Sequence, residues 1–337
     1  MTTDGTIALL NLQAQIDGLE ADDMIESRVC RIELITLRGL LLGRIADYER
    51  AGEIAEQLVR DADTDGRCFI ARARTRATFH RFTDALDDLD RAERLSVDVE
   101  TANRERAPIL QALGRYDEAL AILEEAEDRR ENFENVAALF GLYAERGKID
   151  VAERLYLESR FRYRGVSPFP VALLDFQLGF MWMNEDRLDY ARTAFDAARR
   201  RVPAYAPAQG HLAEVEAELG EIESAIARLR ALATSSDDPD YAAQLARILG
   251  DAGRDDESRH WRRLAAARYD ALVTSHPEAF ADHAAEFWLA AGADPEKALR
   301  LARMNVEVRK TPRAYALLAH AGWRVRRIPG DLTCRKI

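Results

Sequence analysis

Apolar side chains recur along this chain at a spacing of about 34 residues. The clearest marker is an alanine at Ala51, Ala85 and Ala119, and the series continues at Ala152, Ala191, Ala225, Ser258 and Ala298. An aromatic or aliphatic residue stands three positions before most of these markers, and an apolar residue stands four positions after them. Apolar residues at such spacings form one face of a helix. A fixed period in the range of about 20 to 50 residues predicts an array of repeats.

Each repeat contains two such helical segments with a turn between them. A small residue lies twelve positions before most markers, at Gly39, Ala73, Ala107, Gly179, Ala213 and Ala246, although the fourth repeat has Phe140 there. The turns are marked by Gly114, Gly147, Gly220 and Gly253. Glycine ends a helix in the left-handed conformation without a steric penalty. We therefore expect helix hairpins whose small residues let the paired helices approach closely.

The pattern resembles the tetratricopeptide repeat family. The best matches are the segment Leu113–Ala119, which reads LGRYDEA, and the unit with Leu178, Gly179, Trp182, Ala191, Phe195, Ala198 and Pro203. The resemblance covers roughly residues 30 to 320 and implies an all-α, right-handed superhelical solenoid of about eight stacked antiparallel hairpins. The expected units lie near 32–65, 66–99, 100–132, 133–171, 172–205, 206–238, 239–278 and 279–311, with a partial unit at 312–322.

The ends and two connections depart from the period. Residues 1–29 are expected to contain an N-terminal capping helix, and residues 323–337 are expected to form a basic, irregular tail. A longer connection is expected near 163–170, which holds two prolines and a glycine. A long helix from about Arg254 to Val273 is expected before a second loop near Pro277.

Composition narrows the class of protein. The chain has 337 residues and a net charge of −11 at pH 7, which disfavours a general nucleic-acid binder because such domains are usually basic. Its three cysteines, Cys30, Cys68 and Cys334, have no metal-ligand spacing, and we expect buried thiols in a reducing compartment. The sequence shows neither a signal peptide nor a membrane span, so we expect a cytoplasmic protein.

Arginines form one candidate binding patch on the concave face, which the first helix of each unit lines in arrays of this kind. Arg67, Arg74 and Arg104 fall on that face, and arginine binds carboxylates through a planar fork, so an acidic peptide is one interpretation. The alternative is a solvated face or local pairing with Asp and Glu. Arg72 lies instead in the helix-facing register, where Asp88 is its natural partner.

Phe176, Phe180 and Met183 form a second candidate patch on the fifth unit. Aromatic and methionine side chains suit an adaptable peptide pocket. The alternative is the solenoid core, to which the register assigns the neighbouring Leu178 and Trp182. The two interpretations stay open for the three candidate residues.

One cluster near the C-terminus raises metal chemistry. His276, Asp282, His283 and Glu286 could meet on successive helix turns, but their spacing matches no metal motif such as His-Glu-x-x-His. A solvated or capping histidine is the favoured interpretation. We therefore expect no metal and no cofactor, and no phosphate loop or nucleophile elbow points to an enzyme.

These observations favour a non-catalytic scaffold that binds a protein or peptide partner in its concave groove, without nucleic acid or membrane. The expected contact residues are Arg67, Arg74, Arg104, Phe176, Phe180 and Met183. One alternative is a self-assembling module that uses an uncapped C-terminal helix near Leu317 and Leu318. The other alternative is a metal-dependent enzyme built on the histidine cluster.

Overall fold

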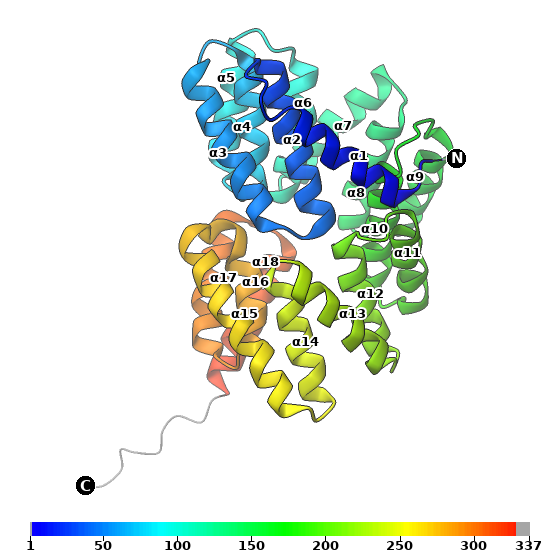
Figure 1. Ribbon diagram of the computed structural model, residues 1–337, viewed down its shortest axis with the longest axis vertical. Coiled ribbons are helices and arrows are strands. Elements are labelled where there is room, and N and C mark those ends of the chain that lie inside the picture. The colour runs from blue at the N-terminus through cyan, green and yellow to red at the C-terminus, as the bar shows by residue number, and fades with distance from the viewer. Residues whose placement is uncertain (1, 328–337) are drawn as a thin grey trace, which may run out of the picture.

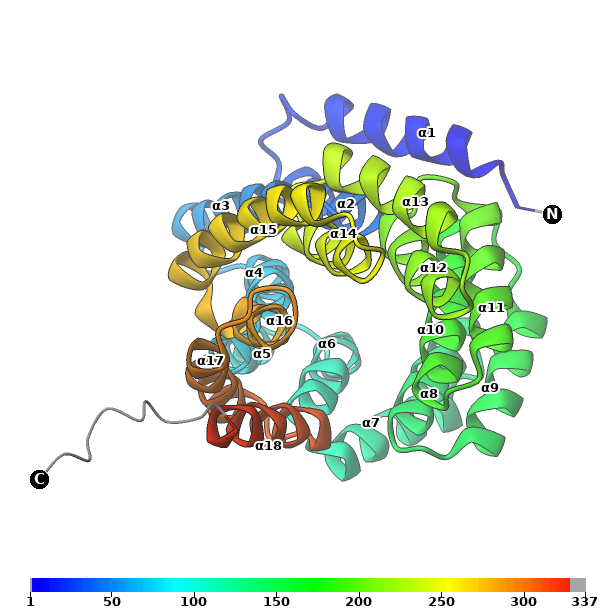
Figure 2. The same ribbon diagram turned by 90° about the horizontal axis from the view of Figure 1, so that it is seen from below.

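The chain folds as a superhelix of stacked helix hairpins (Figure 1). The computed structural model describes residues 2–327, and within that range it contains eighteen helices and no strand. The predicted all-α solenoid is therefore confirmed. Viewed along its axis, the superhelix forms a ring in which α8, α10, α12 and α14 lie inside α9, α11, α13 and α15 (Figure 2).

Sixteen of these helices pair into eight hairpins. The hairpins are α2 (Ile25–Leu42) with α3 (Ile45–Asp61), α4 (Gly66–Thr78) with α5 (Phe82–Arg94), α6 (Val99–Ala112) with α7 (Tyr116–Arg129), α8 (Phe133–Glu145) with α9 (Ile149–Arg162), α10 (Phe169–Asn184) with α11 (Leu188–Arg201), α12 (Ala206–Glu218) with α13 (Ile222–Ser235), α14 (Pro239–Asp251) with α15 (Asp255–Ser275), and α16 (Pro277–Leu289) with α17 (Pro295–Val308). Two single helices, α1 (Gly5–Gly18) and α18 (Pro312–Arg326), complete the described chain.

Each hairpin turns through one residue in the left-handed conformation. Five hairpins use glycine, at Gly43, Gly114, Gly147, Gly220 and Gly253, with φ between 61° and 86°. The other three use His80, Asp186 and Ala293, with φ of 55° to 56°. Because every residue other than glycine meets a steric penalty there, these three turns are held by the surrounding packing rather than by local preference.

The marker alanines lie where the helices of a hairpin cross. Ala51, Ala85 and Ala119 have no exposed surface, and Ser258, the exception in the series, donates its hydroxyl to the carbonyl oxygen of Ala246 at 2.7 Å. A larger side chain at these crossings would overpack a dense core. This steric limit explains why the sequence has a small residue at the marker position of each repeat.

Helix α1 does more than cap the first hairpin. Ala8, Leu12 and Ile16 are buried, and a Cβ atom added to Gly5 would overlap the backbone of Arg201 at the end of α11. The backbone N–H of Thr3 also donates to the carbonyl oxygen of Val166 at 2.7 Å. The helix therefore bridges the first and fifth hairpins across the outside of the ring.

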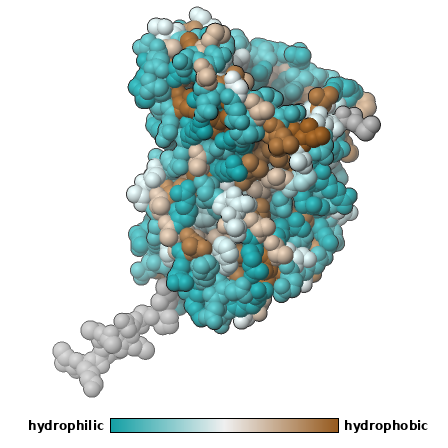
Figure 3. All heavy atoms as spheres, viewed as in Figure 1, coloured by the Kyte–Doolittle hydropathy of each residue, from teal (hydrophilic) through white to brown (hydrophobic). Residues whose placement is uncertain are grey.

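The outward face of α1 stays apolar. Ile7 and Leu10 are exposed by 52% and 66%, and Figure 3 shows apolar surface over this helix. The predicted capping helix thus has a buried side against two hairpins and an apolar side toward solvent.

A seam joins successive turns of the superhelix and closes the ring. We use this name for three contacts. They join the loops within the first three hairpins, α2–α3, α4–α5 and α6–α7, to the later loops α13–α14, α15–α16 and α17–α18, respectively. In Figure 1 the first hairpins, in blue, lie on the last ones, in yellow and orange. At the first contact, Asp237 accepts hydrogen bonds from the backbone N–H groups of Ile45 (2.6 Å) and Ala46 (2.9 Å). A carboxylate from a distant loop therefore caps α3.

The second and third contacts use aromatic rings and a glycine. The rings of Phe79 and His276 stack with centroids 4.0 Å apart, and Nδ1 of His80 donates to the carbonyl oxygen of Glu278 at 3.1 Å. At the third contact, a Cβ atom added to Gly114 would lie only 2.8 Å from the carbonyl oxygen of Lys310. The seam is thus a specific packed interface.

Three local expectations need correction or restriction. Helix α18 continues to Arg326, beyond the expected end at Gly322, whereas residues 328–337, with Cys334, lie outside the described part of the chain. Cys68 is buried as expected, but Cys30 is exposed because it lies on the solvent side of α2.

Candidate functional site

The first helix of each hairpin lines the inside of the ring, which makes the inner wall the candidate binding surface. Arginines on the side of the inner helices that faces the outer helices pair with aspartates of the same hairpin. Arg72 donates to both oxygens of Asp88 at 3.0 and 2.6 Å, which confirms the predicted pair. Arg38 makes an equivalent bidentate contact with Asp47 at 2.8 and 2.5 Å. These arginines hold the two helices of their hairpins together.

Two of the three candidate arginines are paired across neighbouring inner helices. Arg67 contacts Glu26 of α2 at 2.5 Å. Arg74 lies between Glu33 of α2 and Glu105 of α6, and it contacts the latter carboxylate at 2.7 Å. Burial disfavours the charge of Arg74, yet the hydrogen bond that it donates to Glu105 and the charges of Glu105 and Glu33 hold its pKa above the ordinary value. These ion pairs link the neighbouring inner helices α2, α4 and α6.

Arg104 is the most open of the three candidates. Its side chain is 62% exposed, and its partner, Glu100 on the same helix, is 3.5 Å away. Arg104 lines a cavity in the inner wall. The sequence could not distinguish the paired arginines from the open one, because the acids that pair with Arg67 and Arg74 lie on neighbouring helices.

The aromatic candidates also divide. The ring of Phe176 packs against Phe195, Tyr205 and His211, with centroids 5.4 to 5.7 Å apart. Phe180 and Met183 instead line a second cavity, and the guanidinium of Arg313 lies 6.0 Å from the ring of Phe180.

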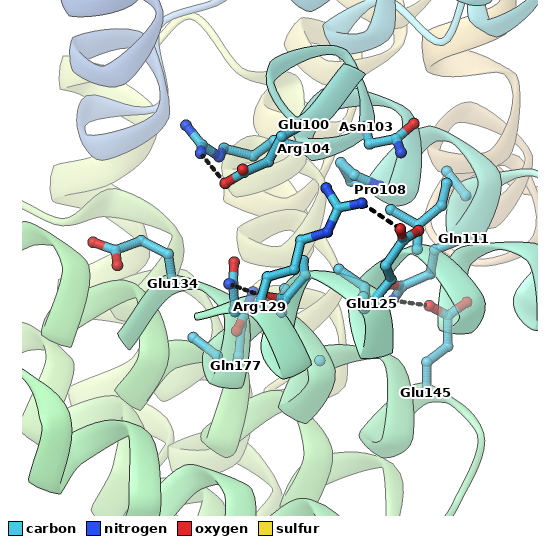
Figure 4. Close-up of a pocket in the computed structure, with 18 of the residues that line it drawn as sticks. Glu100, Asn103, Arg104, Pro108, Gln111, Glu125, Arg129, Glu134, Glu145 and Gln177 are labelled. Atoms are coloured by element: carbon cyan, nitrogen blue, oxygen red, sulfur yellow. Dashed lines mark hydrogen bonds and ion pairs between the residues drawn. The ribbon is translucent and has the colours of Figure 1, made fainter. Parts of the chain in front are cut away.

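The first cavity is a gap in the inner wall, which we call the α6–α8 slot (Figure 4). Successive inner helices pack on each other elsewhere, whereas α6 and α8 scarcely touch. The slot, of about 420 Å³, therefore reaches the inner side of α7. Its apolar surface comes from Pro108, Ala112, Ile122, Leu123, Ala126, Ala137, Ala138 and Gly141.

Charged side chains surround the slot. Arg129 contacts Glu125 at 2.5 Å, and Glu145 accepts hydrogen bonds from Gln111 (2.6 Å) and from the hydroxyl of Tyr116 (2.9 Å). Figure 4 shows the first two of these contacts beside the pair of Glu100 and Arg104. Glu134 also lines the slot. Within residues 2–327, Glu134 and Glu145 make no ion pair, so the rim has two carboxylates without a cationic partner.

Arg309 reaches the slot from the seam. One of its Nη atoms contacts Asp282 at 3.1 Å. Its Nε–H is buried and has no acceptor within the described residues. The slot therefore combines an apolar surface with two carboxylate acceptors.

The second cavity, of about 630 Å³, lies along α10, α12, α14, α16 and α18. His211 lies 3.3 Å from Glu214, and Arg313 contacts Glu286 at 3.1 Å. Burial raises the pKa of Glu218 nearby, and the charge of Glu214 adds to this effect. Acidic and basic side chains thus line this cavity together, with Glu214, Asp240 and Glu286 beside Arg247 and Arg313.

The candidate residues from the sequence did not include two arginines of the second cavity. Arg247 and Arg313 line it from α14 and α18. Both could have been found from the sequence, because the same helical register places Arg247 and Arg313 on the inner faces of α14 and α18. The incomplete last unit concealed the role of α18.

The fold separates His276 from the rest of the histidine cluster. His276 lies at the seam, 3.2 Å from Glu49, and Asp282 pairs with Arg309. The charge of Asp282 raises the pKa of His283, which faces the second cavity. Within residues 2–327, no group of three or more His, Cys, Asp or Glu side chains is arranged to hold a metal ion.

Two other expectations concern surfaces. None of the helices in residues 2–327 has both the length and the apolar character needed to cross a bilayer. On α18, Tyr315 and Trp323 are exposed by 50% and 41%, whereas Leu317 is buried. Self-association through this helix stays a prediction.

Comparisons with known proteins identify the fold. A scan against protein-family models finds no match, and a search of curated proteins finds none either. Among solved structures, the human IFIT1 dimer with m7Gppp-AAAA is similar with a TM-score of 0.57 and 17% identity, over 90% of this chain and 72% of that one. The APC/C hetero-tetramer Cut9-Hcn1 is similar with a TM-score of 0.52 and 16% identity, over 89% and 63% of the respective chains.

At such low identity the likeness concerns the fold alone. Both similar structures are tetratricopeptide-containing proteins. Their helical solenoids agree with the hairpins, the left-handed turns and the buried marker alanines described above. The resemblance predicted from the sequence is thus confirmed for the architecture, and the chain has the tetratricopeptide-type helical solenoid fold.

Proposed function

We propose that the protein is a non-catalytic scaffold whose inner wall binds an extended segment of a partner protein. The observation that carries the proposal is the pair of cavities, about 420 and 630 Å³, that open along this wall. Both volumes fall within the range of about 300 to 1,000 Å³ that is common for ligand sites. Concave walls of this kind serve as extended binding surfaces in solenoids.

The closed ring limits the shape of the partner. Because the seam joins successive turns, the inner wall is reached through the ends of the ring rather than through an open side. A folded domain would have to open the seam, whereas an extended segment would not. Extended segments also match the arrangement of two cavities on the same wall.

A protein partner is favoured over RNA, although the similar IFIT1 structure contains a capped RNA. The chain has a net charge of −11, and Arg67 and Arg74 on the inner wall already contact carboxylates. Phosphate binding depends on arginine and lysine side chains that are available to the nucleic acid. Of the predicted contact residues, we therefore assign binding to Arg104, Phe180 and Met183, and wall structure to Arg67, Arg74 and Phe176.

The test compares a phenylalanine on the inner side of the wall with one on its outer side. Phe180 lines the second cavity, whereas Phe161 on the outer helix α9 is 76% exposed. Immobilised wild-type protein, Phe180→Ala and Phe161→Ala are used to capture proteins from a cell lysate. We expect Phe180→Ala to lose partners that Phe161→Ala retains, with similar melting temperatures. Equal capture by both variants would refute inner-wall binding, and a large drop in melting temperature would assign Phe180 to the core.

A further inference from the structure

We propose that the α6–α8 slot selects the partner, by taking one aliphatic side chain of a segment that carries a lysine or arginine beside it. This inference rests on the proposed function. It also reverses the charge preference suggested by the sequence, in which the arginines of the inner wall indicated an acidic partner.

The interior of the slot suits an aliphatic side chain. Ile122 and Ala126 of α7 are accessible there because α6 and α8 do not close over them. Pro108 on one side and Ala138 on the other complete an apolar surface without an aromatic ring. Apolar side chains that fill preformed pockets at the centre of an interface commonly dominate its affinity.

The charges of the rim favour a cation beside that side chain. Each of the three lining arginines already contacts a carboxylate, as Arg104 does with Glu100, Arg129 with Glu125 and Arg309 with Asp282. Glu134 and Glu145 remain without a cationic partner within residues 2–327. Electrostatic complementarity sets specificity and register more than total affinity. A basic residue in the ligand would therefore fix which segment binds and in which direction.

The two carboxylates without a cationic partner also favour a peptide over RNA. An RNA backbone would bring phosphates toward Glu134 and Glu145, whereas a segment with a lysine or arginine would bring the opposite charge.

The experiment measures binding of short fluorescent peptides to the full-length protein by anisotropy. Three peptides differ in one pair of central residues, which is Leu-Arg, Leu-Glu or Ala-Arg, and a fluorescent oligo(A) RNA is the fourth probe. We expect Leu-Arg to bind the wild type about tenfold more tightly than either other peptide. The Ala138→Trp variant, which fills the slot, should lose this preference, whereas Ala267→Trp on the exposed side of α15 should keep it.

Charge variants separate the two parts of the inference. Glu134→Gln combined with Glu145→Gln should reduce only the preference for Leu-Arg over Leu-Glu. Glu153→Gln, an exposed acid on the outer helix α9, is the control with the same type of charge change. The charge variants retain the size of the side chains, so they keep the inference testable if Ala138→Trp does not fold.

The outcomes distinguish the two proposals. Equal binding of all three peptides, unaffected by Ala138→Trp, would overturn the role of the slot while leaving the scaffold function intact. Preference for Leu-Glu would overturn the charge argument. Binding of oligo(A) RNA without binding of any peptide would overturn both this inference and the proposed function.

Discussion

Removal of the carboxylate of Asp237 tests whether the seam closes the ring. Asp237 lies in the α13–α14 loop and accepts the backbone N–H groups of Ile45 and Ala46 at 2.6 and 2.9 Å. Helix α3 has no capping side chain of its own, because its N-cap residue, Arg44, accepts no hydrogen bond there. The Asp237→Ala variant should therefore leave the start of α3 uncapped.

The expected cost follows from the geometry of this cap. Loss of a capping side chain costs roughly 0.5 to 2 kcal/mol, and loss of a negative charge at a helix N-terminus costs a further ~0.3 to 1 kcal/mol. The side chain of Asp237 is 34% exposed, so solvent screens part of the charge effect. We expect a free-energy change of about 1 to 2 kcal/mol, which corresponds to roughly a tenfold change in an opening equilibrium.

Amide hydrogen exchange provides the measurement. In Asp237→Ala, protection of the Ile45 and Ala46 amides should fall by about tenfold through local opening of the seam. Asp98→Ala is the matched control, since Asp98 caps α6 by accepting from the N–H of Thr101 at 2.8 Å without crossing the seam. That variant should affect the start of α6 alone. Unchanged protection at Ile45 and Ala46 in Asp237→Ala would refute the closing role of this contact.

Three further predictions concern the hairpin turns. Ala293→Gly should raise the free energy of unfolding in urea by about 0.5 to 1 kcal/mol, because alanine at φ 55° is strained there. Gly114→Ala should destabilise more than Gly147→Ala in the same assay, because both have φ above 60° but only the first faces a seam carbonyl, that of Lys310. Burial lowers the pKa of His80 to about 4 in the folded chain, below its ordinary 6.5. The unfolded chain therefore binds a proton first as pH falls from 6.5 toward 4, stability falls with it, and His80→Asn should flatten that part of the stability profile.

The hairpins could be predicted from the sequence because their determinants are local and repeated. Ala85 and Ala119 occupy the same crossing in successive hairpins, and Gly114 and Gly147 occupy the same turn. The turn at Asp186 has the same conformation without glycine, and it could be placed only by counting from its neighbours. Local patterns thus located the elements even where one marker was missing.

The seam and the slot could not be predicted, for a different physical reason. Asp237 and Ile45 are nearly two hundred residues apart, and their contact depends on how small rotations between hairpins add up over a full turn. The slot depends on how far apart α6 and α8 stand, which no local pattern in either helix records. The prediction of the candidate arginines was limited for the same reason, because the acids that pair with Arg74 lie on other helices, α2 and α6. A single sequence specifies each hairpin more directly than the rotation between hairpins.

Closure of the ring has a consequence for binding. An open solenoid can change its curvature, so its inner surface must become ordered when a ligand binds. The entropy lost in that ordering reduces the affinity. Here the cap at Ile45, the stacked rings of Phe79 and His276, and the close approach at Gly114 fix three successive hairpins against the next turn. The hairpin that contains α6 is one of these three, so the seam also fixes one side of the α6–α8 slot. The residues that close the ring therefore help to preorganise the site at which we expect the partner to be selected.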